Sequence, residues 1–499
     1  MSDTKTERQN LTVEKWTTSG RKGLFEACPR FGKTSVGIKI IEESYLKDPT
    51  LNLMIVVPSE IIKQHWLSQA EVHSDIDYIK DLVKDSILTS YALVSKSKSQ
   101  EIETPDLLII DEIHRYFTHG SEEIRKVISN LNFINFLGMT GVKIKEVLPA
   151  NIIAYFGGII DTITEDEAIE NGWVTSYIEY NVPLSLSEYD KERYVGFSKP
   201  ISETLELFRG MKNRLNNRLK HNLFKDDLQV IFGCYSGLKF KGDYLKGHNI
   251  RDLVASTMGW KIDLNPNYPQ NQVIEEFWNP DNLYERCKYF QRALQKRNQI
   301  ILHNRVKIEA VLEILDVNPV PTIIFNDSTD MVDEITNAIR EKVIAYHSNI
   351  KSRPVWDDHT KDYIKVASGK NAGRPRMFGK IMLKKMAIEG MRMGKYKYLV
   401  TAKALDEGLD IANVEQIITT SGSTNPITHF QRTSRGKTIN PKDNSKTTTI
   451  INLYFKDFYN NKAELVRCRD QQKLLMRQKS LDTPIVELNS LSQIRHIFS

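Results

Sequence analysis

The chain has 499 residues, of which 40% are hydrophobic and 26% are charged, a composition typical of a soluble globular protein and too apolar for a disordered one. Its longest apolar runs, such as 51–58, have only strand length and exclude a membrane-spanning helix. The formal net charge of +6 fits a nucleic-acid partner, because phosphate neutralisation needs Lys and Arg.

The cysteines and the N-terminus indicate a reducing compartment. Four cysteines lie far apart and form no CxxC pair, which argues against a zinc site and a disulfide framework: Cys28, Cys234, Cys287 and Cys468. The first ten residues are polar and mixed in charge, unlike a signal peptide. We therefore expect a cytoplasmic protein without a membrane partner.

The first part of the chain, 1–165, alternates strands with helices, the pattern of a parallel sheet flanked by helices. Strands are predicted at 23–27, 51–57, 107–110 and 136–139, and helices at 34–46, 59–72 and 121–130. At this chain length two to three domains are expected, and 1–165 forms the first of them.

The pattern changes at about 166 and returns at 319. The segment 166–318 is richer in helical periodicity and in basic residues, so we expect a mostly helical insert. Strand–helix alternation resumes over 319–460, with strands predicted at 322–325, 343–346, 398–401, 416–420 and 448–453 and a helix at 329–340. The remaining residues, 461–499, are predicted to form a helical tail. The fold class is therefore α/β.

A phosphate-binding turn is predicted by EACPRFGKTS, residues 26–35, which follows a predicted strand and opens a predicted helix. Backbone N–H groups of such a turn, together with the helix N-terminus, form a cradle for phosphate. Lys33 would reach the β- and γ-phosphates, and the Thr34 hydroxyl would bind Mg²⁺. Taken alone, the motif also fits an ordinary strand–turn–helix.

Two acids follow the buried strand in DLLIIDEIHRY, residues 106–116. Ligands of open parallel sheets bind at this carboxyl edge of the strands. Asp111 would hold Mg²⁺ and Glu112 would polarise the attacking water. A lone carboxylate at a strand end is often only structural, but a pair that follows a P-loop in one sheet favours catalysis.

The motifs as a set resemble those of the superfamily 2 helicases and translocases of the DEAD/DEAH-box type, from Gln9 to about Leu453. Besides the P-loop block, the similar segments are VVPSEIIKQHW at 56–66, LTSYALV at 88–94, DEIH at 111–114, GMTG at 138–141, PTIIFNDS at 321–328, VTAKALDEGLDIANVEQII at 400–418 and HFQRTSRGK at 429–437. The resemblance implies two RecA-like parallel-sheet lobes with ATP and Mg²⁺ as cofactors.

The same resemblance implies an ATP site between the lobes. Gln9 stands where an adenine-reading glutamine is usual, and Arg435 is the candidate arginine finger. The full set of expected nucleotide contacts is Gln9, Arg30, Gly32, Lys33, Thr34, Ser35, Gly408, Asp410, Gln431 and Arg435.

Three positions depart from the family pattern. The P-loop has Pro29-Arg30-Phe31 in place of a small, glycine-containing triplet. Ser434 replaces a glycine of the last motif, and Thr438 stands where its final arginine is expected. A second finger is therefore absent, or Lys437 fills it in a weaker role, because Lys lacks the planar fork of Arg.

Nucleic-acid contacts are expected on both lobes, at Pro58, Ser59, Thr89, Ser90 and Thr401. A basic loop with Arg374 and Arg376 in ASGKNAGRPRMFGK, 367–380, is expected to lie outside regular secondary structure and to act as an accessory clamp. Its Gly-Arg-Pro core resembles an AT-hook that reads the minor groove, although a plain basic loop is the favoured interpretation.

These features predict a monomeric ATP-dependent DNA helicase or translocase. The segment 172–194 resembles the connector of DNA-directed and phage-encoded members, for which the location would be the host cytoplasm. The alternatives are an RNA helicase of the same fold, the motor subunit of a restriction or defence assembly, and a nucleic-acid-binding scaffold without ATPase activity. The last is disfavoured by the presence of Lys33, Asp111, Glu112 and Arg435.

Overall fold

The protein is represented by a computed structural model that divides into two compact units. Unit 1 comprises 1–183, 307–454 and 473–499, and unit 2 comprises 184–306 and 455–472. The residues described are 2–74, 76–117, 121–220, 222–237, 249–258, 280–350, 352–354, 356–357, 362–366, 372–402, 411, 413–422, 424–438, 447–478 and 485–498.

The first lobe of unit 1 is built on a six-stranded parallel sheet of order β3-β2-β4-β5-β1-β6. Its strands are β1 (Lys22–Ala27), β2 (Leu53–Val57), β3 (Ile87–Thr89), β4 (Leu107–Ile110), β5 (Asn135–Thr140) and β6 (Ile159–Ile163). Every residue of β2 and β4 is buried, as expected for parallel strands covered on both faces.

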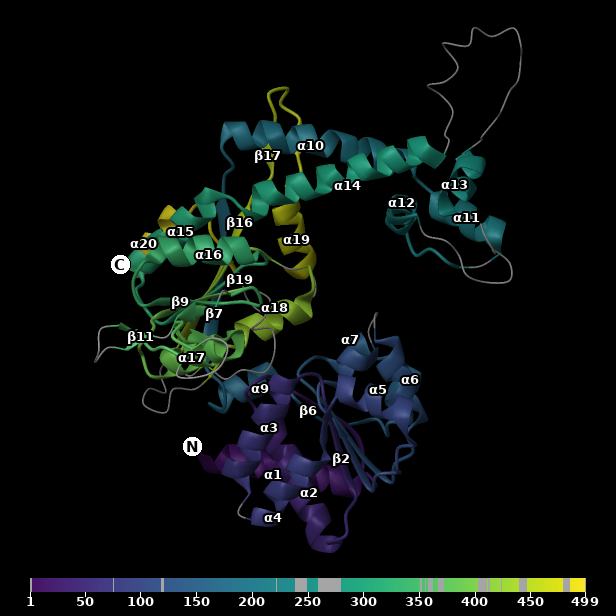
Figure 1. Ribbon diagram of the computed structural model, residues 1–499, viewed down its shortest axis with the longest axis vertical. Coiled ribbons are helices and arrows are strands. Elements are labelled where there is room, and N and C mark those ends of the chain that lie inside the picture. Colours follow the sequence, from purple (N-terminus) through teal and green to yellow (C-terminus); the bar gives the residue numbers. More distant parts are fainter. Residues whose placement is uncertain are drawn as a thin grey trace. The chain divides into compact units, whose positions relative to one another are not determined.

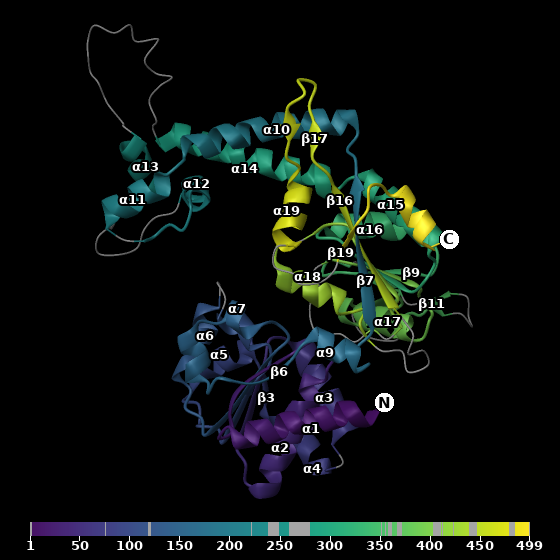
Figure 2. The ribbon, with the colours of Figure 1, turned by 180° about the vertical axis from the view of Figure 1, so that it is seen from behind.

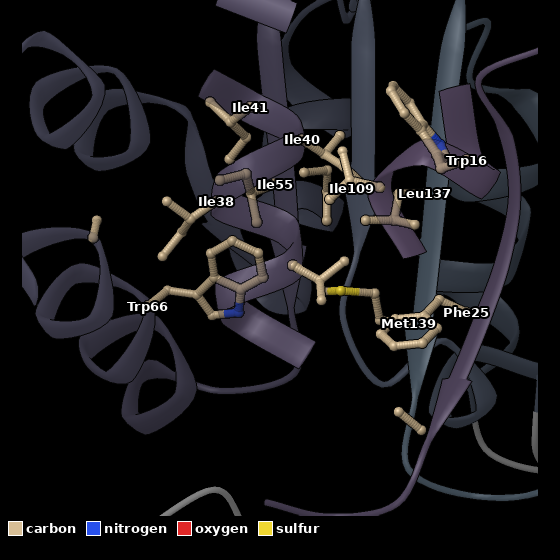
Figure 3. Packing of buried hydrophobic residues seen from close by; sticks show 14 of the residues in the cluster. Trp16, Phe25, Ile38, Ile40, Ile41, Ile55, Trp66, Ile109, Leu137 and Met139 are labelled. Atoms are coloured by element: carbon tan, nitrogen blue, oxygen red, sulfur yellow. The ribbon is translucent and has the colours of Figure 1, made fainter. Parts of the chain in front are cut away.

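Helices cover both faces of this sheet (Figure 1). One face packs on α1 (Ser2–Thr18), α2 (Lys33–Lys47), α3 (Glu60–His73) and α4 (Asp77–Ser86), around a core that includes Trp16, Ile55 and Trp66 (Figure 3). The other packs on α5 (Ser90–Ser99), the 3-10 helix η1 (Ile113–Phe117), α6 (Glu122–Asn130), α7 (Ile144–Val147) and α8 (Ala150–Tyr155). The helix α9 (Glu165–Glu170) follows β6.

The second lobe of unit 1 contains a seven-stranded sheet of order β19-β7-β16-β15-β8-β14-β9. Its strands are β7 (Ser176–Leu184), β8 (Thr322–Phe325), β9 (Val343–Tyr346), β14 (Tyr398–Thr401), β15 (Gln416–Thr419), β16 (Thr447–Phe455) and β19 (Ile485–Glu487). Pairing is parallel from β16 to β9 and between β19 and β7.

The helices of the second lobe include α18 (Pro426–Thr433), which carries the expected nucleotide contact Gln431, and α19 (Arg469–Gln478). The others are α15 (Arg305–Val317), α16 (Thr329–Ile339), α17 (Lys380–Arg392) and α20 (Ser492–Phe498). Among the described residues, no helix combines the length and apolarity needed to cross a bilayer.

Unit 2 is helical. Its long helices α10 (Glu188–Leu207) and α14 (Pro280–Leu302) lie side by side, and α11 (Met211–Leu219), α12 (Asp227–Ser236) and α13 (Ile250–Met258) gather near one end of the pair (Figure 2). These helices enclose an apolar core of their own that includes Phe208, Ile231 and Phe290. The short strands β17 (Phe458–Tyr459) and β18 (Leu465–Val466) form a hairpin of the same unit.

The two parallel-sheet lobes expected from the sequence are confirmed, but the observed boundaries differ from the expected ones. Residues 176–184, expected within the helical insert, form β7 of the second sheet, and residues 485–487, expected in a helical tail, form β19 beside it. Both were missed because β19 is only three residues long and because β7 lies far in sequence from the strands it joins. Residues 455–472, expected in the second lobe and the tail, belong to unit 2.

The expectation of an irregular loop around Arg374 and Arg376 is wrong for the described part of that segment. Ile364 and Val366 exchange backbone hydrogen bonds with residues 373–376, and β13 (Met377–Phe378) pairs antiparallel with β10 (Arg353–Pro354). The glycine that suggested irregularity, Gly373, has a φ of 80° and accommodates the turn of this ribbon. Both arginine side chains are exposed.

A buried ionic cluster joins four elements of the second lobe. The carboxylate of Glu179, on β7, accepts from His429 Nε2 on α18 at 3.0 Å and from Asn452 Nδ2 on β16 at 2.6 Å. Arg477 of α19 lies 3.9 Å away. Burial opposes ionisation of Glu179, yet His429, Arg477 and Asn452 outweigh it and lower the pKa of Glu179 from 4.5 to about 2.

We predict that Glu179→Gln lowers the free energy of unfolding by about 3 kcal/mol near neutral pH, the equivalent of the shift in its pKa. A depressed carboxylate pKa stabilises the fold above the unfolded value, and this contribution is lost as the pH falls from 4.5 toward about 2. Urea denaturation should therefore show that the difference in the free energy of unfolding between Glu179→Gln and the unaltered chain becomes smaller as the pH falls from 7 to 3. Glu170→Gln, at an exposed position, is the control, and an equal effect of both changes would contradict the role of the cluster.

Candidate active site

The P-loop turn lies between β1 and α2, and its backbone is shaped by two left-handed residues. Gly32 has a φ of 102° and Arg30 has a φ of 72°. The φ of Arg30 explains why similar P-loops usually have glycine in this part of the turn, because a residue with a side chain is strained in the left-handed region. Arg30 is held by two contacts: its carbonyl accepts from Lys5 Nζ at 2.8 Å, and its Nε donates to the Ser434 carbonyl at 3.4 Å.

Gln9 is buried against the P-loop. Its Nε2 donates to the carbonyl of Phe31 at 3.0 Å, and a Cβ added to Gly32 would lie 2.5 Å from the same nitrogen. A side chain at residue 32 would therefore displace the Gln9 amide, and the φ of 102° would strain it. Gln9 braces the turn by this contact, and its expected contact with adenine stays a prediction.

Lys33 and Thr34 begin α2, with Ser35 buried behind them. The ammonium of Lys33 donates to the Ala27 carbonyl at 3.4 Å, and a Cβ on Gly141 would lie 3.2 Å from it. The free N–H groups at the first turn of a helix favour anions. The positive charge of Lys33 at the N-terminus of α2 strengthens this attraction for anions.

Asp111 follows β4 and is fixed by two donors. Its Oδ2 accepts from Trp66 Nε1 on α3 at 2.9 Å, and its Oδ1 accepts from the Glu112 backbone N–H at 2.9 Å. Burial and the neighbouring Glu112 raise the pKa of Asp111 to about 6, against the opposing effects of Trp66 and Lys33. A cation bound beside Asp111 would favour its ionised form.

Glu112 has a φ of 48° and turns its carboxylate toward β5. Its Oε2 accepts from the Gly141 N–H at 3.3 Å and lies 3.4 Å from His114 Nδ1. That nitrogen also lies 2.8 Å from Thr140 Oγ1. Burial opposes ionisation, but Lys33, His114, Arg115 and the Gly141 N–H together outweigh it and lower the pKa of Glu112, so this carboxylate is ionised.

Arg435 stands in the turn after α18 and is 5% exposed. The next residue, Gly436, packs directly on β16: its carbonyl accepts from Thr448 Oγ1 at 2.6 Å, and an added Cβ would lie 2.4 Å from Thr448 Cγ2. This contact sets the position of the arginine backbone. Ser434, where the family has glycine, donates its hydroxyl to the Gln431 carbonyl at 2.8 Å.

Lys437 has a different environment. Its ammonium pairs with Glu165 on α9 and lies 3.7 Å from the centre of the Tyr177 ring. Its backbone carbonyl accepts from the Thr175 N–H at 3.1 Å. These contacts are structural, and Lys437 does not line the cavity described next.

One cavity of about 230 Å³ in unit 1 brings most of the expected nucleotide contacts together. It is lined by Arg30, Gly32, Lys33, Thr34, Asp111, Glu112, Gln431 and Arg435, all of which the sequence had suggested, and by His65, Gln69 and Arg115, which it had not. Gln9 and Ser35 lie behind the P-loop and do not line it. Gly408 and Asp410 fall outside the described residues.

The expected nucleic-acid contacts in the first lobe follow neighbouring strands. Ser59 caps α3 and Thr89 caps α5, each through its hydroxyl, and Ser90 Oγ donates to the Pro58 carbonyl at 3.3 Å. The hydroxyls of Ser59 and Thr89 are engaged in these caps. A phosphate bound at this edge would therefore contact the remaining backbone N–H groups at the N-termini of α3 and α5. Thr401 differs: it is fully buried and donates to the Ala402 carbonyl at 2.7 Å.

The residues present fit ATP and Mg²⁺. A glycine at position 32 leaves the turn open, and Lys33 supplies a charge for phosphate. Thr34 and Asp111 offer two oxygen ligands on one cavity wall. Among the described residues no group of three or more His, Cys, Asp or Glu gathers to hold an ion. Mg²⁺ needs only one or two carboxylates, because it completes its shell with phosphate and water.

Residues 3–144 match the family model described as type III restriction enzyme, res subunit. The matched segment contains the P-loop and both acids, on a parallel sheet whose order is now established. The similarity to this family therefore covers most of the first lobe, to which the P-loop and both acids belong. The second lobe carries Gln431 and Arg435 on the wall of the same cavity.

Two solved helicase structures are similar to the chain. The helicase domain of Pyrococcus furiosus Hef aligns at 14% identity with a TM-score of 0.44, covering 94% of this chain and 97% of that one. Dbp5 of S. cerevisiae, bound to RNA and ADP BeF3, aligns at 9% identity with a TM-score of 0.47, covering 96% and 88%. No curated protein matches the chain.

Trp66 was not predicted as part of the site, although it stands in the segment 56–66 that resembles a helicase motif. Its indole is fully buried and its N–H points to the carboxylate expected to bind the metal. The signal available in the sequence was a tryptophan on a helix that follows the next strand of the sheet. Only the structure shows that this helix turns the indole toward Asp111.

We predict that Trp66→Phe raises the Mg²⁺ concentration needed for half-maximal ATP hydrolysis by about tenfold, because a hydrogen bond to a charged group contributes about 1.5–3 kcal/mol. Titration of Mg²⁺ in a steady-state ATPase assay measures this shift. The matched control is Trp16→Phe in the same core, whose indole donates to the Phe136 carbonyl and not to Asp111. Equal Mg²⁺ dependence in the two variants would rule out the positioning role of Trp66.

Proposed function

We propose that the protein is a nucleic-acid-dependent ATPase that couples ATP hydrolysis to movement on DNA or to its unwinding. The observation that carries the proposal is the single cavity that holds Lys33, Asp111, Glu112 and Arg435. A lysine for phosphate, an acid for Mg²⁺, a second acid for water and an arginine for the γ-phosphate are the parts that phosphoryl transfer requires.

The chain's own residues divide this chemistry between them. Lys33 and the first turn of α2 bind the phosphates, while Thr34 and Asp111 supply oxygens to the metal. Mg²⁺ held by these oxygens would neutralise charge on the phosphates. Glu112, which its lowered pKa keeps ionised, accepts the proton of the attacking water. Arg435, which lines the same cavity, stabilises the charge of the transition state.

Several features support a nucleic-acid substrate. The N-termini of α3 and α5 lie at one edge of the first sheet, at Pro58–Ser59 and Thr89–Ser90, where a sugar–phosphate backbone can bind. The exposed Arg374 and Arg376 add two charges on the ribbon of the second lobe. DNA is preferred over RNA on the resemblance of the segment 172–194 to the connector of DNA-directed helicases.

A second candidate function is the motor of a restriction or defence assembly. It is favoured by the match of residues 3–144 to the res subunit of type III restriction enzymes. In both cases we propose a cytoplasmic protein, on the basis of cysteines that are all free and buried. As a helicase it would act as a monomer, and as a motor subunit it would copurify with a nuclease from its native source.

The test is ATP turnover by the purified chain across a panel of single-stranded DNA, duplex DNA, forked DNA and single-stranded RNA. The proposal expects at least one DNA to stimulate turnover by tenfold or more over the basal rate, with RNA weaker, an order-of-magnitude expectation for a coupled motor. Preferential stimulation by RNA would favour the RNA helicase. Turnover that no nucleic acid changes would contradict a nucleic-acid motor.

We predict that Lys33→Ala and Glu112→Gln each reduce ATP hydrolysis to the background of the assay. Lys33→Ala removes the charge that holds the phosphates, so its nucleotide affinity falls as well. Glu112→Gln removes only the proton acceptor and should still bind ATP, as measured with a fluorescent ATP analogue. Hydrolysis at the unaltered rate by either variant would show that the active site lies elsewhere.

Arg435→Ala should lower kcat by about a thousandfold and leave nucleotide affinity nearly unchanged, because a finger acts mainly in the transition state. Lys437→Ala is the comparison. Its loss leaves Glu165 without its buried cation, so that variant should lose thermal stability by about 3 kcal/mol and keep kcat within a few-fold. If Lys437→Ala proves to be the kinetically more damaging change, Arg435 is not the finger.

A further inference from the structure

Unit 2 carries the excess positive charge of the chain. Its residues, 184–306 and 455–472, include 24 Lys and Arg against 17 Asp and Glu, whereas the rest of the chain has 45 against 46. The net charge of +6 is therefore not spread over the helicase lobes. A basic unit on a motor that is otherwise neutral points to a polyanionic partner for that unit.

The helices α12, α13 and α14 meet near one end of unit 2 (Figure 2). Aromatic and cationic side chains lie next to one another at this junction. The rings of Tyr235 on α12 and Tyr284 on α14 are stacked, with an interplanar angle of 3° and centroids 6.2 Å apart. The guanidinium of Arg251, on α13, lies 4.5 Å from the Tyr284 ring centre, and Lys288 Nζ lies 5.1 Å from it.

This group is fixed in place but remains at the surface. Arg251 is anchored because its Nε donates to the Cys234 carbonyl at 2.6 Å and its Nη2 to the Tyr235 carbonyl at 3.2 Å. Tyr235 is 39% exposed, and the nearby Phe232 and Tyr289 are 40% and 58% exposed. The apolar core of unit 2 lies elsewhere in the same helices, at residues such as Ile231, Cys234 and Phe290.

Further basic residues lie on the adjoining helix. Arg214 and Arg218 of α11 and the following Lys220 are exposed, and α11 packs against α12 and α13. Arg218 bridges to α13 through Ser256 Oγ at 2.7 Å and Thr257 Oγ1 at 2.9 Å. Cations that follow a backbone, next to flat rings, form the arrangement that binds single-stranded nucleic acid.

We infer that Tyr235, Tyr284 and Arg251 form a base-stacking platform on unit 2 for a single strand of nucleic acid. Unpaired bases stack on the tyrosine and guanidinium planes, and the cations of α11 contact the phosphates. An acidic protein would complement the positive charge of unit 2 but would not need the stacked rings of Tyr235 and Tyr284. The stacked rings therefore favour nucleic acid as the partner. The inference rests on the proposed function and extends it, because it assigns a nucleic-acid contact outside the two helicase lobes.

The experiment measures binding of the full chain to labelled oligo(dT), to an abasic oligomer of equal length and to polyglutamate, by fluorescence anisotropy. Replacing both Tyr235 and Tyr284 with Ala should weaken oligo(dT) binding by about tenfold or more, the range found when stacked aromatics are removed. The salt dependence should stay the same, because no phosphate contact is lost. Binding to the abasic oligomer should also stay the same, since it has no bases to stack.

Three further variants control for packing and for nonspecific effects. Tyr235→Leu with Tyr284→Leu keeps apolar bulk against α14 and should lose affinity like the Ala pair, whereas Tyr235→Phe should bind normally. Tyr78→Ala removes a tyrosine that is 53% exposed on α4 of the first lobe and stacks on Tyr45, and this variant should also bind normally.

The inference is overturned if both double variants bind oligo(dT) as the unaltered chain does, or if they lose oligo(dT) and abasic affinity equally. Tighter binding of polyglutamate than of oligo(dT) by the unaltered chain would instead point to an acidic protein. The proposed function is judged separately, by stimulation of ATP turnover in the unaltered chain. That stimulation can persist when the platform is absent, and the platform can bind even if turnover fails.

Discussion

Two carboxylates and one ammonium at the carboxyl edge of a parallel sheet determine how the rest of the first lobe is built. Asp111 and Glu112 repel each other when both are charged, and burial sharpens that repulsion. Lys33 offsets it from the P-loop side, and Trp66 and the Gly141 N–H offset it from α3 and β5. The two carboxylates have different pKa values for this reason: that of Asp111 is raised and that of Glu112 is lowered.

The second lobe contributes Arg435 to the candidate active site. It does so by holding the short helix α18 and the turn that follows it in a fixed position. At the turn, Gly436 packs on Thr448 of β16, which leaves little freedom to the backbone of Arg435. At the start of α18, His429 is tied to Glu179 in a buried cluster that also includes Asn452. Since β7 and β16 supply these partners, these two strands fix the helix that precedes the candidate finger.

The sequence was sufficient for the features that local patterns encode. The all-apolar runs at 53–57 and 107–110 predict buried strands, and Lys33, Asp111 and Glu112 follow such strands at positions where a parallel sheet gathers them. Contacts between distant segments were not predictable in this way. Nothing in the local sequence shows that Gln9 holds the Phe31 carbonyl, that Trp66 reaches Asp111, that Lys437 pairs with Glu165 or that Thr401 is buried. β19 was missed because three residues carry too little alternation to indicate a strand.

The most direct test of this account is the Mg²⁺ dependence of ATP-analogue binding, compared between the unaltered chain and Asp111→Asn. With a non-hydrolysable analogue, Mg²⁺ should tighten binding to the unaltered chain by about tenfold or more, a coupling of roughly 1.4 kcal/mol, and should have much less effect on Asp111→Asn. The account would be contradicted if Mg²⁺ left the affinity of the unaltered chain for the analogue unchanged, or if it changed the affinity equally in both proteins. Either result would exclude a metal–nucleotide site at the end of β4.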